Sequence, residues 1–261
     1  MPQPPRPYVL SLAGFDPSGG AGLLADCKTF EQLGAYGFGV CTALTVQTDV
    51  TFERVQWVPL ADIQAQAKPL LTRFRVEWAK IGLLENLAEL PRLLQWLRTQ
   101  NPAIGLVWDP VLKASAGYDF HAGPPPELVA QLCSGLTLLT PNQPEMQRLW
   151  PAAATSAEAA AAVSAYCPVL LKGGHADSAE AVDVLFQRGR EVAHFAAPRL
   201  PHGEKHGSGC VLSAAVVAGL ARGESLVEAC RLGKKYTARV LASNETLLGY
   251  HFQNQYDHAN Q

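Results

Sequence analysis

Residues 8–34 read YVLSLAGFDPSGGAGLLADCKTFEQLG, and this stretch indicates how the chain folds. Tyr8–Ala13 is an apolar run typical of a buried strand, and Ala21–Leu33 has the pattern of a helix that ends at Gly34. A glycine-rich turn joins the two. Because Phe38–Val46 predicts the next strand, the segment is a strand–helix–strand unit, which builds a parallel sheet covered by helices.

The same alternation of strands and helices continues along the chain. Further strands are expected at residues 78–81, 104–108, 136–139 and 169–171, with a hairpin of residues 182–187 and 192–197. Helices are expected at residues 63–74, 87–97, 152–165, 210–221 and 226–241. We therefore expect an α/β fold with three layers, α/β/α, and a mostly parallel central sheet. It would form one domain over residues 1–261, of which the proline-rich residues 1–7 would be flexible.

The composition is that of an ordinary globular enzyme. Hydrophobic residues make up 48% and charged residues 17%, and a formal net charge of −2 without a basic stripe argues against a nucleic-acid partner. The first residues lack the pattern of a signal peptide, and the longest apolar stretch, Val211–Ala221, is too short to span a membrane. Six scattered cysteines without a C-x-x-C pair fit a reducing compartment. We expect a cytoplasmic protein with no membrane partner.

Glycines and polar residues follow the ends of the predicted strands. In open α/β sheets, ligands bind beyond the carboxyl ends of the strands, so we expect these segments to converge on one site. They are residues 14–16, 47–49, 109–110, 140–142 and 172–174.

The segment His206-Gly207-Ser208-Gly209-Cys210 lies directly before an apolar helix and is the strongest candidate for an anion site. Glycines let the backbone approach an anion, and the first N–H groups of a helix then point at it. Cys210 would lie in the first helical turn, where the pKa of a thiol is lowered, and could act as a base toward a hydroxyl group. A glycine-rich turn with a buried cysteine explains the same residues.

Two carboxylates and one lysine follow apolar strands and are candidates for binding a metal and phosphate groups. Asp109 and Glu145 are expected near Mg²⁺, which often takes only one or two protein carboxylates. Lys172 precedes a pair of glycines and is expected to face nucleotide phosphates, although an ordinary exposed lysine fits as well. Glu145 also fits a helix cap, because Asn142-x-x-Glu145 has that spacing.

Asp26 and Gln47 are the candidates for direct contact with a small-molecule substrate. Asp26 follows the first glycine loop and could accept a hydrogen bond, but a carboxylate that stabilises the helix dipole is an alternative. Gln47 ends the second predicted strand, where its amide could both donate to and accept from a ring with an amino group. A polar strand end is the alternative there.

In their order, these segments resemble the hydroxymethylpyrimidine/phosphomethylpyrimidine kinases of thiamine biosynthesis, which belong to the ribokinase superfamily. The resemblance extends from Ser11 to about Ser243. Its blocks are residues 13–22 with 25–30, and residues 42–47, 80–84, 109–111, 140–145, 171–175 and 206–210.

The resemblance implies a ribokinase-like fold, an ATP- and magnesium-dependent kinase, a homodimer, and a role for each candidate residue. Cys210 would be the catalytic base, with the backbone of Gly207, Ser208 and Gly209 as the anion hole. The pyrimidine pocket would be lined by Gly14, Asp26, Thr45, Gln47 and Leu83. The nucleotide side would consist of Lys172, Asn142, Gly207 and Gly209, with Asp109 and Glu145 at the magnesium ion.

Some residues depart from the family pattern and leave the substrate open. Ser208 stands where threonine is usual, and Thr45 and Leu83 stand where apolar residues and methionine are common. Glu204-Lys205 replaces a common Asn-Thr before the anion hole. Alternative functions are phosphorylation of vitamin B6, hydrolysis by a pair of Cys210 and His206, and pyrimidine binding without catalysis.

Overall fold

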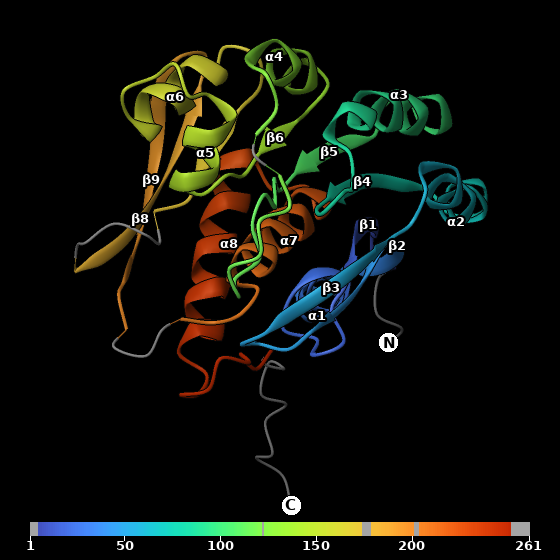
Figure 1. The fold of residues 1–261 in the computed structure, drawn as a ribbon, viewed down its shortest axis with the longest axis horizontal. Helices are drawn as coiled ribbons and strands as arrows, with labels where there is room; N and C mark the ends of the chain where they lie inside the picture. Colours follow the sequence, from blue (N-terminus) through green and yellow to red (C-terminus); the bar gives the residue numbers. More distant parts are fainter. Residues whose placement is uncertain (1–4, 122, 174–178, 201–203, 252–261) are drawn as a thin grey trace, which may run out of the picture.

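The computed structural model describes residues 5–121, 123–173, 179–200 and 204–251 (Figure 1). The strands are β1 (Tyr8–Phe15), β2 (Tyr36–Gln47), β3 (Phe52–Trp57), β4 (Val76–Ile81), β5 (Gly105–Trp108), β6 (Leu138–Leu139), β7 (Val169–Leu171), β8 (Glu180–Gln187) and β9 (Arg190–Pro198). The helices are α1 (Gly22–Gln32), α2 (Leu60–Arg73), α3 (Leu90–Gln100), α4 (Pro126–Ser134), α5 (Gln143–Leu149), α6 (Ser156–Val163), α7 (Ser208–Ala221) and α8 (Leu226–Leu241), with a 3₁₀ turn at Leu87–Glu89.

The strands form one sheet in the order β3-β2-β1-β4-β5-β6-β7-β8-β9. The central strands, from β2 to β7, pair in parallel. The pairs β2–β3, β7–β8 and β8–β9 are antiparallel. The expectation of a mostly parallel sheet is therefore confirmed, and the predicted hairpin forms one edge.

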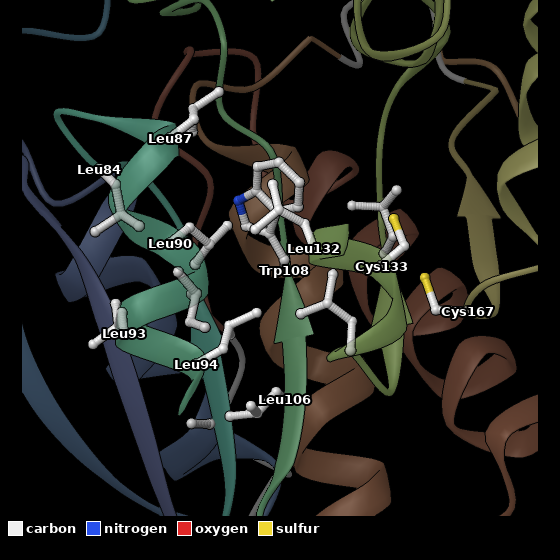
Figure 2. Close-up of a cluster of buried hydrophobic side chains, with 14 of the residues drawn as sticks. Leu84, Leu87, Leu90, Leu93, Leu94, Leu106, Trp108, Leu132, Cys133 and Cys167 are labelled. Atoms are coloured by element: carbon white, nitrogen blue, oxygen red, sulfur yellow. The ribbon is translucent and has the colours of Figure 1, made fainter. Parts of the chain in front are cut away.

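Helices cover both faces of this sheet, because its strands alternate apolar side chains between two cores. On β1, Leu10 and Leu12 contact one core and Val9 the other. The first core packs against α2, α3, α4 and α6, and the second against α1, α7 and α8. Figure 2 shows part of the first core, where Leu90, Leu93 and Leu94 of α3 lie on one side of Trp108 of β5 and Leu132 of α4 lies next to it. This arrangement confirms the three layers.

Three helices or strands, β3, α4 and α5, are absent from the expectation, and β3 and α4 show why. β3 reads FERVQW and is largely exposed, so it lacks an apolar pattern, and it forms because its backbone pairs with β2. α4 begins with proline after two further prolines, a composition typical of a loop, but proline is tolerated in the first turn of a helix. In both cases the local sequence signal was weaker than the tertiary contacts.

The expected flexibility of residues 1–7 falls partly on residues 1–4, which lie outside the described residues, while Arg6 forms an ion pair with Glu31. Among the helices that the structure describes, none has the length and apolar character needed to cross a membrane.

Candidate active site

Two glycine loops meet at the carboxyl ends of the central strands. Gly207 has a φ of 77°, and a Cβ there would lie 2.1 Å from the carbonyl oxygen of Gly20. Gly22 has a φ of 58°, and a Cβ there would lie 2.2 Å from the carbonyl oxygen of Gly14. Only glycine fits such close backbone approaches. They bring the first turns of α1 and α7 together.

A buried pair of side chains fixes these loops to each other. His206 Nε2 lies 2.9 Å from Asp16 Oδ2, and both side chains are buried. Asp16 also accepts hydrogen bonds from Ser18 and from the main chain of Ala21. Burial alone would raise the pKa of Asp16, but the hydrogen bonds from His206, Ala21 and Ser18 outweigh it and lower the pKa below its ordinary value.

The contact between His206 and Asp16 is evidence against the alternative of a hydrolase with a Cys210–His206 pair. His206 Nδ1, its other ring nitrogen, is buried and has no hydrogen-bond partner among the described residues. His206 is therefore not paired with Cys210, and the arrangement that a cysteine hydrolase needs is not formed.

Cys210 lies in the first turn of α7, where the main-chain N–H of Gly22 donates a hydrogen bond to its thiol. The expectation of a lowered pKa is wrong. Burial raises the pKa of Cys210 to about 11, and the nearby charge of Lys80 opposes this increase only in part. A thiolate at this position is consequently a strong base, but only a small fraction of it forms at neutral pH.

Lys80 and Asp26 form a buried ion pair beside Cys210. Lys80 Nζ lies 2.6 Å from Asp26 Oδ1, and Ser11 Oγ donates to Asp26 Oδ2 over 2.6 Å. Both charged side chains have no exposed surface. Burial raises the pKa of Asp26, whereas the charge of Asp26 outweighs burial at Lys80 and raises the pKa of the lysine. The hydrogen-bonded pair keeps both charges in the core.

The role of Lys80 was not predicted, although the sequence carried a signal for it. Lys80 lies in the otherwise apolar end of β4, and a charge at such a position requires a buried partner. Asp26 was predicted to bind substrate, but both of its carboxylate oxygens already accept hydrogen bonds from the protein. Its contact with substrate stays a prediction.

A second buried cluster brings together the three predicted metal and phosphate residues. Lys172 Nζ lies 2.7 Å from Asp109 Oδ1 and 3.7 Å from Glu145 Oε2. Ser213 of α7, which the sequence did not single out, donates to Asp109 over 3.0 Å. A Cβ at Gly209 would lie 3.2 Å from Lys172 Nζ, so the anion-hole loop adjoins this lysine. The reading of Lys172 as an exposed lysine is wrong.

Glu145 has two functions in the fold at once. It forms a capping box with Asn142, which is the N-cap of α5, and it faces Lys172 and Asp109. Burial raises the pKa of Glu145 to about 7, with the charge of Asp109 acting in the same direction and that of Lys172 against it. The pKa of Asp109 is lowered, because Lys172 and Lys80 outweigh the effect of its burial.

We expect Glu145→Gln to change the pH dependence of stability. A carboxyl with a folded pKa of about 7, above its ordinary value, stabilises the fold fully at acidic pH and loses this contribution as the pH rises through 7. Between about pH 5.5 and pH 8, the free energy of unfolding of the wild type should fall by about 2 kcal/mol relative to the variant. Urea denaturation without magnesium measures this difference. Parallel pH profiles of the two proteins would contradict it.

The predicted pyrimidine residues gather at the ends of β1, β2 and β4. A Cβ at Gly14 would lie 3.3 Å from the side chain of Leu83, which places these two residues together. Thr45 donates to the carbonyl oxygen of Phe15 over 2.9 Å, and Gln47 Nε2 contacts Thr45 Oγ1 at 2.9 Å. The four predicted residues therefore line the strand ends near the glycine loops, while their binding role stays a prediction.

The chemistry of the donor set agrees with magnesium. Asp109 and Glu145 present carboxylate oxygens to one lysine, and Mg²⁺ commonly takes one or two carboxylates together with phosphate oxygens and water. No larger group of three or more metal-binding side chains occurs within the described parts of the chain. A closed structural metal site is therefore not formed by these residues.

The three-layer fold and the position of this site define the ribokinase-like class of small-molecule kinases. The sequence model of the family described as phosphomethylpyrimidine kinase matches residues 16–254. The chain belongs to this family.

Individual relatives agree with this assignment. The hydroxymethylpyrimidine/phosphomethylpyrimidine kinase of Salmonella typhimurium is 36% identical over 93% of both chains. The crystal structure of phosphomethylpyrimidine kinase from Clostridium difficile is 30% identical, with a TM-score of 0.71 over 89% of this chain and 98% of that one. Pyridoxal kinase from Staphylococcus aureus, in complex with AMP-PCP and pyridoxal, is 27% identical, with a TM-score of 0.79 over 92% and 89%.

Proposed function

We propose that this protein is an ATP-dependent kinase that phosphorylates 4-amino-5-hydroxymethyl-2-methylpyrimidine and then its monophosphate in thiamine biosynthesis. The observation that carries the proposal is the position of Cys210. Its thiol lies in the first turn of α7, directly after the anion-hole glycines, where the charges of Lys80, Asp26 and Asp109 act on it. The family and its Salmonella relative support the substrate.

The proposed reaction uses Cys210 and the glycine loop directly before it. Cys210, as the thiolate, would take the proton of the substrate hydroxymethyl group, whose oxygen then attacks the γ-phosphorus of ATP and releases ADP. In the second step the base acts on the phosphate of the monophosphate. The main-chain N–H groups from Gly207 to Cys210 would stabilise the charge on the transferred phosphoryl group. Lys172, which adjoins this loop, and Asn142 at the start of α5 would also contact the phosphates.

Asp109 and Glu145 would hold Mg²⁺, which supplies positive charge to the ATP phosphates. Without the metal, Lys172 pairs with both carboxylates and limits their mutual repulsion. Asp26 and Gln47 would recognise the polar groups of the pyrimidine, and Gly14, Thr45 and Leu83 would pack against the ring.

The second candidate is phosphorylation of pyridoxal or pyridoxine. It is favoured by the similarity of the fold to pyridoxal kinases, whose Staphylococcus aureus member is known in complex with pyridoxal. Steady-state ADP release with the pyrimidine alcohol, its monophosphate and the B6 vitamers decides between the two. We expect the highest kcat/KM with the pyrimidine alcohol. A higher kcat/KM with pyridoxal would make this protein a pyridoxal kinase, and tight pyrimidine binding without ADP release would make it a binding protein.

We also propose that the protein forms a homodimer through the edge of the sheet. Exposed apolar side chains occur there: Leu44 and Val46 on β2, Val50 between β2 and β3, and Tyr118 against β3. Leu44, Val46 and Tyr118 are 46%, 38% and 43% exposed, and Tyr118 stacks on Phe52 of β3. Exposed apolar side chains next to an edge strand, here β3, are typical of an interface.

We expect Leu44→Glu to dissociate the homodimer, because a charge would then be buried in the contact. Light scattering after size exclusion measures the mass of the wild type and of the variant. The control is Val192→Glu on β9, which is exposed to a similar degree, 48%, but lies at the opposite edge of the sheet. A monomeric wild type, or a dimer in all three proteins, would contradict this interface.

Two further parts of the proposal are the domain organisation of the chain and its location in the cell. We propose that it acts as one catalytic domain, because strands from both halves of the chain contribute to the same sheet and the same site. A cytoplasmic location is supported by the six cysteines, which are all free.

A further inference from the structure

Lys205 is a buried lysine directly before the anion-hole loop, and oxygens surround its ammonium group. Lys205 Nζ donates to the carbonyl oxygen of Asn244 over 2.6 Å, to the carbonyl oxygen of Thr246, and to Asn244 Oδ1 over 3.3 Å. The residue is only 6% exposed. No carboxylate within the described parts of the chain forms an ion pair with it. Neutral oxygens thus replace the water around this cation.

These oxygens belong to a short stretch after α8, residues 243–249, which we name the C-terminal segment. Asn244 organises it, because its Oδ1 accepts from the main-chain N–H of Thr246 and its Nδ2 donates to the carbonyl oxygen of Leu248. The segment contains no helix or strand. Its shape therefore depends on these few hydrogen bonds and on Lys205.

The C-terminal segment contacts both glycine loops of the active site. The main-chain N–H of His206 donates to the carbonyl oxygen of Leu247 over 2.9 Å. A Cβ at Gly20 would lie 2.8 Å from the side chain of Leu248, so this side chain packs against the first loop. Gly207 then follows with the left-handed conformation that starts α7. A displaced segment would release the residues that aim the N–H groups of the anion hole.

The ammonium group has a specific effect that an apolar side chain lacks. Converging carbonyl oxygens repel one another, and burying them without a donor carries the cost of unsatisfied polar groups. A cation that donates to all three oxygens removes both costs. Charged hydrogen bonds of this kind are stronger than neutral ones. Lys205 is therefore the group that holds the segment in its present shape.

We propose that Lys205 is a positioning residue for phosphoryl transfer. Its ammonium group fixes the C-terminal segment against the anion-hole loop and so orients the N–H groups from Gly207 to Cys210. It touches no reacting atom. The inference rests on the proposed kinase function and adds a residue that the anion hole depends on.

The first test is the kinetics of Lys205→Met, which keeps the length of the side chain and removes its charge. We expect kcat to fall about tenfold or more, because misplaced donors stabilise the transition state less well. The KM of the pyrimidine alcohol should change little, since its pocket lies at the ends of β1, β2 and β4. The matched control is Lys235→Met, an exposed lysine of α8, which should leave kcat unchanged. A kcat of Lys205→Met within about twofold of the wild type would overturn the proposal.

The second test separates the ammonium group from a merely structural contribution. Lys205→Ala leaves room for a small amine, and we expect ethylammonium chloride to restore part of kcat. Tetramethylammonium chloride at the same ionic strength has no N–H donor and should restore none. Equal kcat values with the two salts would overturn the role of the ammonium group.

Asn244→Ala provides an independent variant if the Lys205 variants do not fold. It leaves the lysine but removes one oxygen from the ammonium group and the bonds of Asn244 to Thr246 and Leu248, which shape the same segment. A fall in kcat of about threefold or more supports the proposal, and an unchanged kcat overturns it. Failure of the proposed function would be recognised separately. The wild type would then consume no ATP with any of the alcohols, and the positioning role would fall with it.

Discussion

Replacing Cys210 with alanine is expected to lower kcat by about a thousandfold, the usual contribution of a general base. Binding of ADP should stay close to that of the wild type, because the proposed phosphate contacts come from Lys172 and the main chain of the anion hole. A coupled assay of ADP release measures kcat, and calorimetry measures nucleotide affinity. A variant with the kcat of the wild type would exclude Cys210 as the base.

The pH profile makes this test specific. Burial raises the pKa of Cys210 to about 11. As long as the pH is below this pKa, the thiolate fraction therefore increases tenfold with each unit by which the pH rises. The logarithm of kcat/KM should therefore rise with a slope near one from about pH 6 to about pH 9 in the wild type, and this slope should be absent in Cys210→Ala. The matched control is Cys27→Ala on α1, because Cys27 is also partly buried and its pKa is also raised to about 11. It should keep both the slope and the rate.

Replacing Lys172 with methionine is expected to impair both stability and catalysis. The variant leaves Asp109 and Glu145 buried without their cation, and the loss of one partner of a buried ion pair costs about 3–5 kcal/mol. The KM of ATP should rise and kcat should fall, because a charge next to the anion-hole glycines is lost. Urea denaturation and steady-state kinetics measure the two effects.

A second buried ion pair provides the control. Lys234 pairs with Asp183 over 3.0 Å, and their side chains are 11% and 4% exposed, close to the 12% and 2% of Lys172 and Asp109. Lys234→Met should therefore lose a similar amount of stability while the KM of ATP stays near that of the wild type. If Lys172→Met and Lys234→Met lost activity equally, the loss of activity in Lys172→Met would result from lower stability alone.

Much of the fold follows from local patterns along the chain. The apolar runs predicted β1, β2 and the parallel strands that follow, because residues buried on both faces need continuous hydrophobic sequence. β3 escaped prediction, since an exposed edge strand carries no such pattern. The glycine segments at the strand ends also predicted where the site lies, because parallel strands end at the same edge of a sheet.

The sequence by itself determined which kinds of group meet at the candidate active site, and the tertiary structure alone decided how they pair. Lys80 and Asp26 are 54 positions apart and His206 and Asp16 are 190 apart, so no local pattern connects them. Burial is also a tertiary property, and it raises the pKa of Cys210 where the helix position alone predicted a lower one. The motifs in residues 8–34 and 206–210 determine the class of chemistry. The contacts among the buried charged side chains decide in which protonation states these side chains enter the reaction.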